Sequence, residues 1–235
     1  MEPTNNTARL AGALYVLLGL TAPFSLLYVP GKLIVRGNAT ATAQNVLGSE
    51  MMFRWGMVGE LAGTVLFAVL VMVLYRLLNR VDKMQASLMA IFALISVPIT
   101  FVGVVNEIAA LTLLRAPAFL STFSKPQLEA MALFFLGLHG RTILVNEMFW
   151  GLWLFPFGLL VMRSRFIPRI LGILLIINCF AYLAESLTGL LVPDYAGAVS
   201  KVATYAEFGE LWIMLWLLIK GAKVEPVRSL APAAA

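Results

Sequence analysis

Hydrophobic residues in this chain gather in six long runs that are separated by short polar stretches. A bilayer core about 30 Å thick is crossed by about 20 apolar residues in a helix, and each run is at least that long. We therefore predict an all-α fold, an integral membrane bundle of six transmembrane helices in a single domain over residues 1–235. The predicted spans are 9–29, 53–77, 85–114, 140–162, 168–191 and 200–220.

Short interfacial helices are predicted in the outer loops. Residues 37–50 have the composition of a helix lying at the surface, with Asn38 or Thr40 as its N-cap. Ser124, followed three residues later by Gln127, matches a capping box, so a helix should begin near residue 125.

The segment from residue 125 to residue 162 has two possible structures. As one helix it would be about 57 Å long, far more than the bilayer core requires. It must then either project outward or bend near Gly137 and Gly140, where a bend is inexpensive.

The composition excludes a soluble fold. The chain is 61% hydrophobic and 12% charged, with a mean hydropathy of +0.91, whereas soluble domains are about half apolar and about a quarter charged. Its net charge of +5 could suit nucleic acid, but the basic residues lie at the ends of the apolar runs, as topology signals do. We therefore expect contact with membrane lipids and no nucleic-acid partner.

Several cofactor chemistries are excluded by the residues present. Cys179 is the single cysteine and His139 the single histidine, so one chain cannot form a disulfide, a CxxC metal site or bis-histidine haem ligation. No P-loop, HExxH or GxSxG motif occurs. We expect no haem and no nucleotide, while a divalent metal remains open as a cofactor.

Acidic residues fall inside the predicted spans at one common depth. Counted from the outer end of each helix at 1.5 Å per residue, six of them lie roughly 10–15 Å below the outer boundary. They are Glu60, Glu107, Glu147, Glu185, Glu207 and Glu210. An ionised acid at mid-membrane costs about 2.5–3.5 kcal/mol on insertion scales, so these side chains should face the bundle interior. We predict that Glu60, Glu107, Glu147 and Glu210 share one cavity.

His139 should join these acids from above. At 100° per residue, Asn146 and Glu147 share a broad helix face with His139, whereas Arg141 points away unless the helix bends at Gly140. Carboxylates with one imidazole suit hard or borderline divalent ions. The predicted metal ligands are His139, Glu60, Glu107 and Glu147. The predicted ligand pocket, open to the outer side, adds Glu210, Asn106, Asn146, Arg54, Arg141, Glu185 and Glu207.

Three functions remain open at this point. The pocket could bind a metal ion or small cation for transport or sensing. The same residues could serve an intramembrane enzyme that acts on a lipid or isoprenoid with a metal or by acid–base chemistry. The chain could also be a structural helper subunit, in which the polar residues only tie helices together and His139 is an ordinary interfacial residue. Assembly into a homo-oligomer is open as well.

Several separate motifs resemble a known family. They are ARLAGALYVLLGL at 8–20, KLIVRGNATATAQNVLGSEMMFRWG at 32–56, RSRFIPRILGILL at 163–175, the LHG around His139, and GELWIMLWLLIKG at 209–221. Together they resemble the bacterial membrane family known as domain of unknown function 4386 over nearly the whole chain. The resemblance implies a bacterial multi-pass membrane protein, commonly with Asp at the position of Glu60 and His at that of His139. It implies no catalytic residue.

The orientation in the membrane follows from lysine and arginine near the span ends, because cytoplasmic loops are enriched in them. One side has Arg9, Arg76, Arg80, Lys83, Arg163, Arg165, Arg169, Lys220, Lys223 and Arg228. The other has only Lys32, Arg36, Arg54, Arg115, Lys125 and Lys201. We therefore predict the bacterial inner membrane with both termini in the cytoplasm.

Reporter fusions at the two ends of the chain test this orientation. We expect a reporter that is active only in the cytoplasm to report from both ends, because both adjoin the more basic side. A periplasmic signal from either end would contradict the predicted topology.

Overall fold

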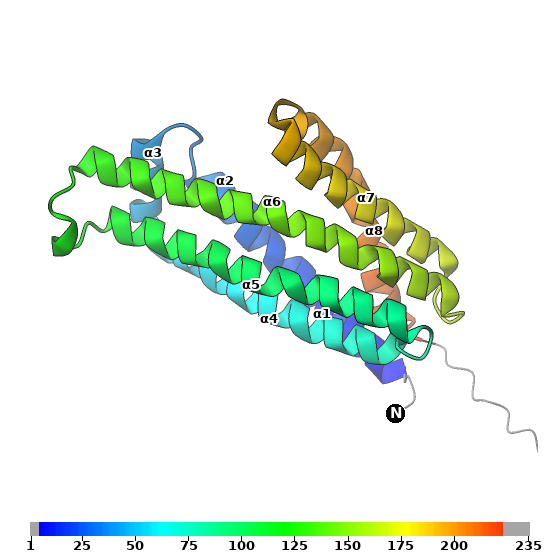
Figure 1. Ribbon diagram of the computed structural model, residues 1–235. Coiled ribbons are helices and arrows are strands. Elements are labelled where there is room, and N and C mark those ends of the chain that lie inside the picture. Colours follow the sequence, from blue (N-terminus) through cyan, green and yellow to red (C-terminus); the bar gives the residue numbers. More distant parts are fainter. Residues whose placement is uncertain (1–4, 223–235) are drawn as a thin grey trace, which may run out of the picture.

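Long helices run side by side through the structure, which is a computed structural model and describes residues 5–222 (Figure 1). The α-helices are α1 (Asn5–Pro23), α2 (Val29–Leu33), α3 (Ala39–Gly48), α4 (Glu50–Leu78), α5 (Lys83–Leu114), α6 (Lys125–Arg163), α7 (Arg169–Leu191) and α8 (Ala196–Ile219). Short 3-10 turns lie at Ala118–Leu120 and Pro193–Tyr195. Six helical segments are long and apolar enough to cross a membrane, so the predicted all-α fold with six spans is confirmed.

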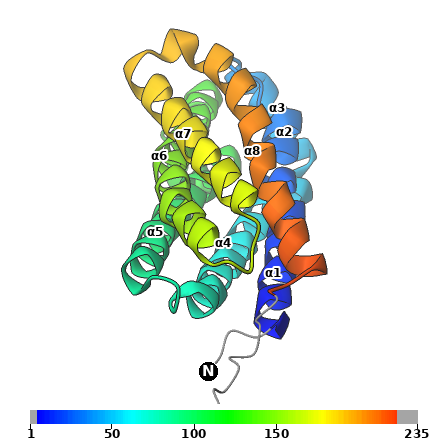
Figure 2. The same cartoon turned by 90° about the vertical axis from the view of Figure 1, so that its right-hand side faces the viewer.

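The six spans form a closed ring in chain order. The helix that begins with α1 packs on α4, α4 on α5, α5 on α6, α6 on α7, α7 on α8, and α8 returns to α1. Figure 2 shows this circuit, with α8 beside α1. A ring of this kind gives every span one face toward a shared interior, and that interior is where polar side chains can avoid lipid.

The first span contains one turn of π-helix, Phe24–Tyr28, between α1 and α2. The backbone N–H of Val29 bonds to the carbonyl of Phe24, five residues back, and Pro30, which has no N–H to donate, follows. Single π turns inside α-helices are frequent at functional sites. This wider turn places the buried Ser25 against Gly59 of α4. A larger residue at position 59 would occupy the space that the Ser25 side chain fills.

The segment from 125 to 163 is one helix, α6, which continues through Gly140 without a break. Its predicted capping box is present: the backbone N–H of Ser124 donates to Oε1 of Gln127 at 2.8 Å. The predicted surface helix is α3, capped by Asn38. Thr40 of α3 donates to the carboxylate of Glu129 at 2.8 Å, which fixes α3 on α6. Glu129 is buried at this contact.

Two apolar clusters fill the bundle, and a polar layer separates them. The larger cluster contains Leu70, Met89, Leu154, Phe157 and Leu217, among other residues. The smaller one lies toward the predicted outer side, where α2 to α6 meet, and includes Val46, Phe53, Leu111 and Leu128. Along α4 the layer between them begins near Glu60, and along α6 it begins near His139.

Glycines allow a close helix crossing between α6 and α7. A methyl group added at Gly158 would lie 2.7 Å from the carbonyl oxygen of Gly172, and one added at Gly172 would lie 2.6 Å from that of Gly158. Small residues allow such close backbone approach in membrane bundles.

We expect Gly158→Ala to lower the melting temperature in detergent, because the new methyl group would collide with backbone that cannot rotate away. The matched control is Gly140→Ala in the same helix, where the added methyl group meets nothing within 4 Å. Alanine is the better helix former, so the control should melt at the same temperature or slightly higher. Equal melting of the two variants would contradict tight packing at this crossing.

Candidate functional site

Three buried side chains from consecutive spans meet inside the ring. Nε2 of His139 on α6 lies 3.7 Å from Oε2 of Glu60 on α4 and 3.9 Å from Oε1 of Glu107 on α5. One ligand atom from each residue lies within 4.8 Å of the other two. We call Glu60, Glu107 and His139 the triad. Each is at most 8% exposed, so none faces lipid.

The triad has unused hydrogen-bonding capacity. Nε2 of His139 and Oε2 of Glu107 have no hydrogen-bond partner, while the imidazole also interacts with the backbone of Gly103. Buried polar atoms without partners are rare in folded proteins, and each one requires an explanation such as a bound ion or ligand. The absence of a side chain at Gly103 makes room for this arrangement, since a methyl group there would lie 3.2 Å from Nδ1 of His139.

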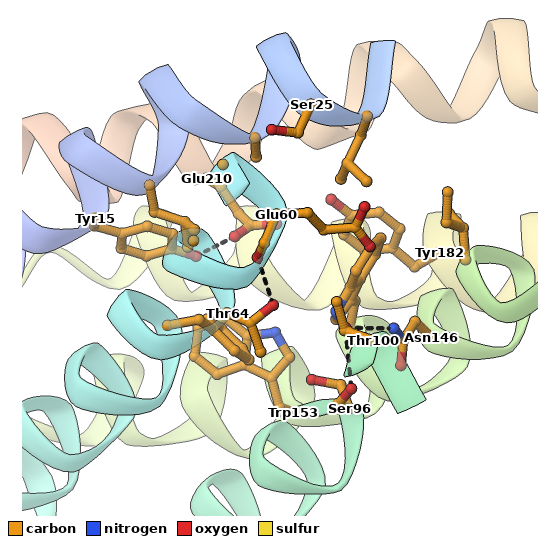
Figure 3. A pocket seen from close by; sticks show the side chains of 18 residues that line it. Tyr15, Ser25, Glu60, Thr64, Ser96, Thr100, Asn146, Trp153, Tyr182 and Glu210 are labelled. Atoms are coloured by element: carbon orange, nitrogen blue, oxygen red, sulfur yellow. Dashed lines mark hydrogen bonds between the residues drawn. The ribbon is translucent and has the colours of Figure 1, made fainter. Parts of the chain in front are cut away.

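A cavity of about 190 Å³ adjoins the triad and is lined by residues from all six spans. Figure 3 shows Glu60 and Glu210 among its wall residues, together with Tyr15, Trp153 and Tyr182. Glu60 therefore belongs both to the triad and to the cavity wall. Two of the four glutamates predicted to share a cavity, Glu60 and Glu210, line it, whereas Glu107 and Glu147 are not among the residues that do.

Glu210 is held on the wall by the two neighbouring spans. Its Oε1 accepts a hydrogen bond from Nδ2 of Asn178 on α7 at 2.7 Å, and its Oε2 accepts one from the hydroxyl of Tyr15 on α1. Both carboxylate oxygens are thus used as acceptors, which suits an ionised carboxylate. The side chain is fixed in position by donors from both sides.

Asn146 closes another part of the wall. Its Nδ2 donates to Oγ1 of Thr100 at 2.8 Å, and that hydroxyl donates to the carbonyl of Ser96 at 3.1 Å. Oδ1 of Asn146 has no hydrogen-bond partner. Asn146 thus ties α6 to α5.

The remaining intramembrane acids form a separate group between α6, α7 and α8. Glu185 and Glu207 share a hydrogen bond, and Glu147 interacts electrostatically with Glu185. A hydrogen bond between two carboxyl groups requires a proton on one of them. Glu147 lies about 12 Å along α6 from His139, so the carboxylates beside the imidazole are Glu60 and Glu107.

Besides Glu147, Glu185 and Glu207, three further residues predicted for the pocket lie away from it. Arg54 pairs with Glu50 at 2.6 Å, and Arg115 pairs with the same carboxylate at 2.7 Å. Arg141 is exposed, because α6 continues without a bend through Gly140. Asn106 donates to the carbonyl of Val102 on its own helix. No lysine or arginine is among the described residues that line the cavity.

Tyr15, Tyr182, Ser25 and Asn178 belong to this site or support it and were not predicted from the sequence. Tyr15 has the position of an ordinary aromatic residue of a first span, and Tyr182 and Ser25 carry no pattern of their own. Asn178 offered one signal, since an amide inside an apolar run needs a partner in the bundle. Only packing shows that its partner is Glu210.

A ring of apolar spans around buried carboxylates and one imidazole defines a multi-pass membrane protein with an intramembrane polar site. The chain belongs to the family described as Domain of unknown function (DUF4386), whose model matches residues 10–221. This confirms the resemblance inferred from the sequence motifs.

One curated relative is an uncharacterized protein of Archaeoglobus fulgidus, 33% identical over 85 residues. The alignment covers 36% of this chain and 49% of the relative, so it spans about half of that protein. No solved structure matches the chain.

We expect His139→Gln and Glu107→Gln to have non-additive effects on stability, because both side chains belong to one buried site. A double-mutant cycle of melting measurements in detergent should give a coupling of about 1 kcal/mol or more, in the range found for residues in contact. The control cycle pairs His139→Gln with Glu147→Gln, and it should be additive to within about 0.5 kcal/mol. Additive behaviour in the first cycle would show that His139 and Glu107 act independently.

Proposed function

We propose that this protein binds a divalent metal ion at Glu60, Glu107 and His139, for uptake or sensing of the ion from the outer side of the membrane. The observation that supports this most directly is the convergence of three buried ligand atoms within 4.8 Å, from three different spans. A structural role alone would be expected to satisfy the polar atoms of the triad with protein partners, and Nε2 of His139 and Oε2 of Glu107 have none.

Charge balance favours a divalent ion over a proton or a monovalent cation. Two carboxylates carry two negative charges, and a neutral imidazole adds a ligand without adding charge. A divalent cation therefore makes the site electrically neutral in surroundings of low dielectric, where an uncompensated charge is expensive. No described lysine or arginine lines the adjoining cavity to supply the balance instead.

The geometry fits an ion after a small movement. Ligands about 2.0–2.2 Å from a metal ion stand roughly 3.0–3.5 Å from one another. The observed separations of 3.7 and 3.9 Å exceed this slightly, so a change in side-chain torsion closes the site. Carboxylate and imidazole ligands suit zinc, manganese and ferrous iron. Three protein ligands also leave a coordination position for water or substrate.

The outward direction of the site is supported by the packing around it. On the predicted inner side the cavity wall ends at Phe67 and Trp153, whose rings meet edge to face at 5.3 Å, and Phe157 stacks on Trp153. Basic residues then follow at the helix ends, including Arg163, which pairs with Asp82. We propose that this end is cytoplasmic, that both termini lie there, and that the membrane is the bacterial inner membrane.

An intramembrane enzyme is the second candidate, and one observation favours it. Glu60 lies on both the triad and the cavity wall, so an ion at the triad would face a space large enough for part of a substrate. A metal ion with an open position can polarise a carbonyl or activate water. Incubation of the metal-loaded protein with mixed lipid vesicles, followed by mass spectrometry, tests this. Products that require both metal and Glu107 would favour the enzyme.

Elemental analysis of the purified full chain tests metal binding directly. We expect one divalent ion per chain, and a loss of affinity of at least about tenfold in Glu107→Gln, because the amide is a weaker ligand that carries no charge. The control is Glu147→Gln, which should keep the ion because Glu147 lies outside the triad. Affinity should also fall as the pH is lowered, since the ligands must lose their protons to bind.

Two results would contradict the proposal. The first is a chain that binds none of the three metals when each is added to the purified protein. The second is equal loss of the ion in Glu107→Gln and Glu147→Gln, which would place the ligands elsewhere among the intramembrane acids.

A further inference from the structure

Glu210 is a second centre of negative charge in the cavity, separate from the triad. It lies on α8, whereas the triad lies on α4, α5 and α6. If a divalent ion neutralises Glu60 and Glu107, Glu210 still has no counter-charge among the described residues that line the cavity. Its two hydrogen bonds, from Tyr15 and Asn178, stabilise a carboxylate but add no positive charge.

Aromatic rings make up much of the wall around this carboxylate. Tyr15, Phe67, Trp150, Trp153 and Tyr182 all line the cavity. The face of an aromatic ring carries partial negative charge and attracts cations, and tryptophan is the strongest of the three types. A carboxylate among aromatic rings is the chemistry that recognises ammonium groups bearing carbon substituents.

The rings are held in place before any ligand arrives. Trp153 packs against Tyr15 at 6.3 Å, Phe67 at 5.3 Å and Phe157 at 5.3 Å between ring centroids. Trp150 meets Tyr182 edge to face at 6.3 Å. A pocket whose walls are already ordered loses less entropy on binding.

We propose that the cavity binds a small organic ammonium cation, with Glu210 as its counter-ion and the aromatic rings around its carbon substituents. The volume of about 190 Å³ is smaller than the pockets of drug-sized ligands, so the ligand has the size of a substituted amine with a few carbon atoms. This site is independent of the proposed metal site, because it depends on Glu210 and not on Glu107.

Other ligand classes fit the same wall less well. A second metal ion would need more ligands near Glu210, and the triad is the group of three that the described part of the chain brings within metal distance. A neutral ligand would leave the carboxylate without a counter-charge in a poorly solvated space. An anion would be repelled by Glu60 and Glu210 together.

Choline and its uncharged isostere 3,3-dimethylbutan-1-ol provide a matched pair of probes. Binding to the purified full chain in maltoside detergent is measured by calorimetry and by the fluorescence of tryptophan, two of which line the cavity. We expect choline to bind at least about tenfold more tightly than the alcohol, because the two have similar shapes and differ in charge. Equal affinity for the two probes would overturn the proposal.

Substitutions on α8 separate Glu210 from its acidic neighbour. Glu210→Gln should weaken choline binding at least about tenfold. Glu207→Gln, one turn away and outside the residues that line the cavity, should leave it unchanged. Equal weakening by both changes would show a general effect of acidic charge and overturn the assignment to Glu210.

Three further variants keep the test decisive if Glu210→Gln does not fold. Trp150→Leu should weaken choline binding several-fold while Trp150→Phe keeps most of it, because phenylalanine retains an aromatic face. Glu107→Gln should lose the metal ion and keep choline. Choline binding that is unaffected by either Trp150 change, or lost together with the metal in Glu107→Gln, would reject an independent ammonium site.

Discussion

Keeping carboxylates and an imidazole inside a membrane bundle is the constraint on which this structure depends. Each ionised group left in hydrocarbon would cost several kcal/mol, so lipid-facing positions are closed to it. The closed ring of six spans provides an interior for these groups, and the apolar clusters above and below confine them to one layer. The helices are consequently arranged so that Glu60, Glu107 and His139 meet one another rather than lipid.

Close backbone approach makes that arrangement possible. Gly59 leaves room for Ser25 of the π-helical turn, and Gly103 leaves room for the imidazole of His139. Both glycines lie where a polar side chain of the adjacent span enters the interior. Because the helices approach closely at these positions, the side chains of Ser25 and His139 are buried in the interior.

The bundle interior has two acidic groups with different chemistry. The triad on α4, α5 and α6 offers ligand atoms that have no hydrogen-bond partner, while Glu210 is already held by Tyr15 and Asn178 from the neighbouring spans α1 and α7. The proposed metal and ammonium sites would therefore use different residues of one interior. If both sites were occupied, the bound cations would neutralise the acids of the interior. Side chains from all six spans would then contact a bound cation, so ligand binding would stabilise the ring.

The sequence by itself determined the six spans, a capped helix beginning near residue 38 and the capping box at Ser124, since these depend on apolar length and local hydrogen bonding. Only the tertiary structure decided how each helix is rotated about its own axis and which helices it packs against. The predicted depth of a residue along its helix does not show whether Glu107 or Glu147 lies beside His139. Nor does it show that Arg54 pairs with Glu50 rather than lying in the pocket. Those pairings follow from which helix faces pack together, and packing depends on the shapes of all six spans at once.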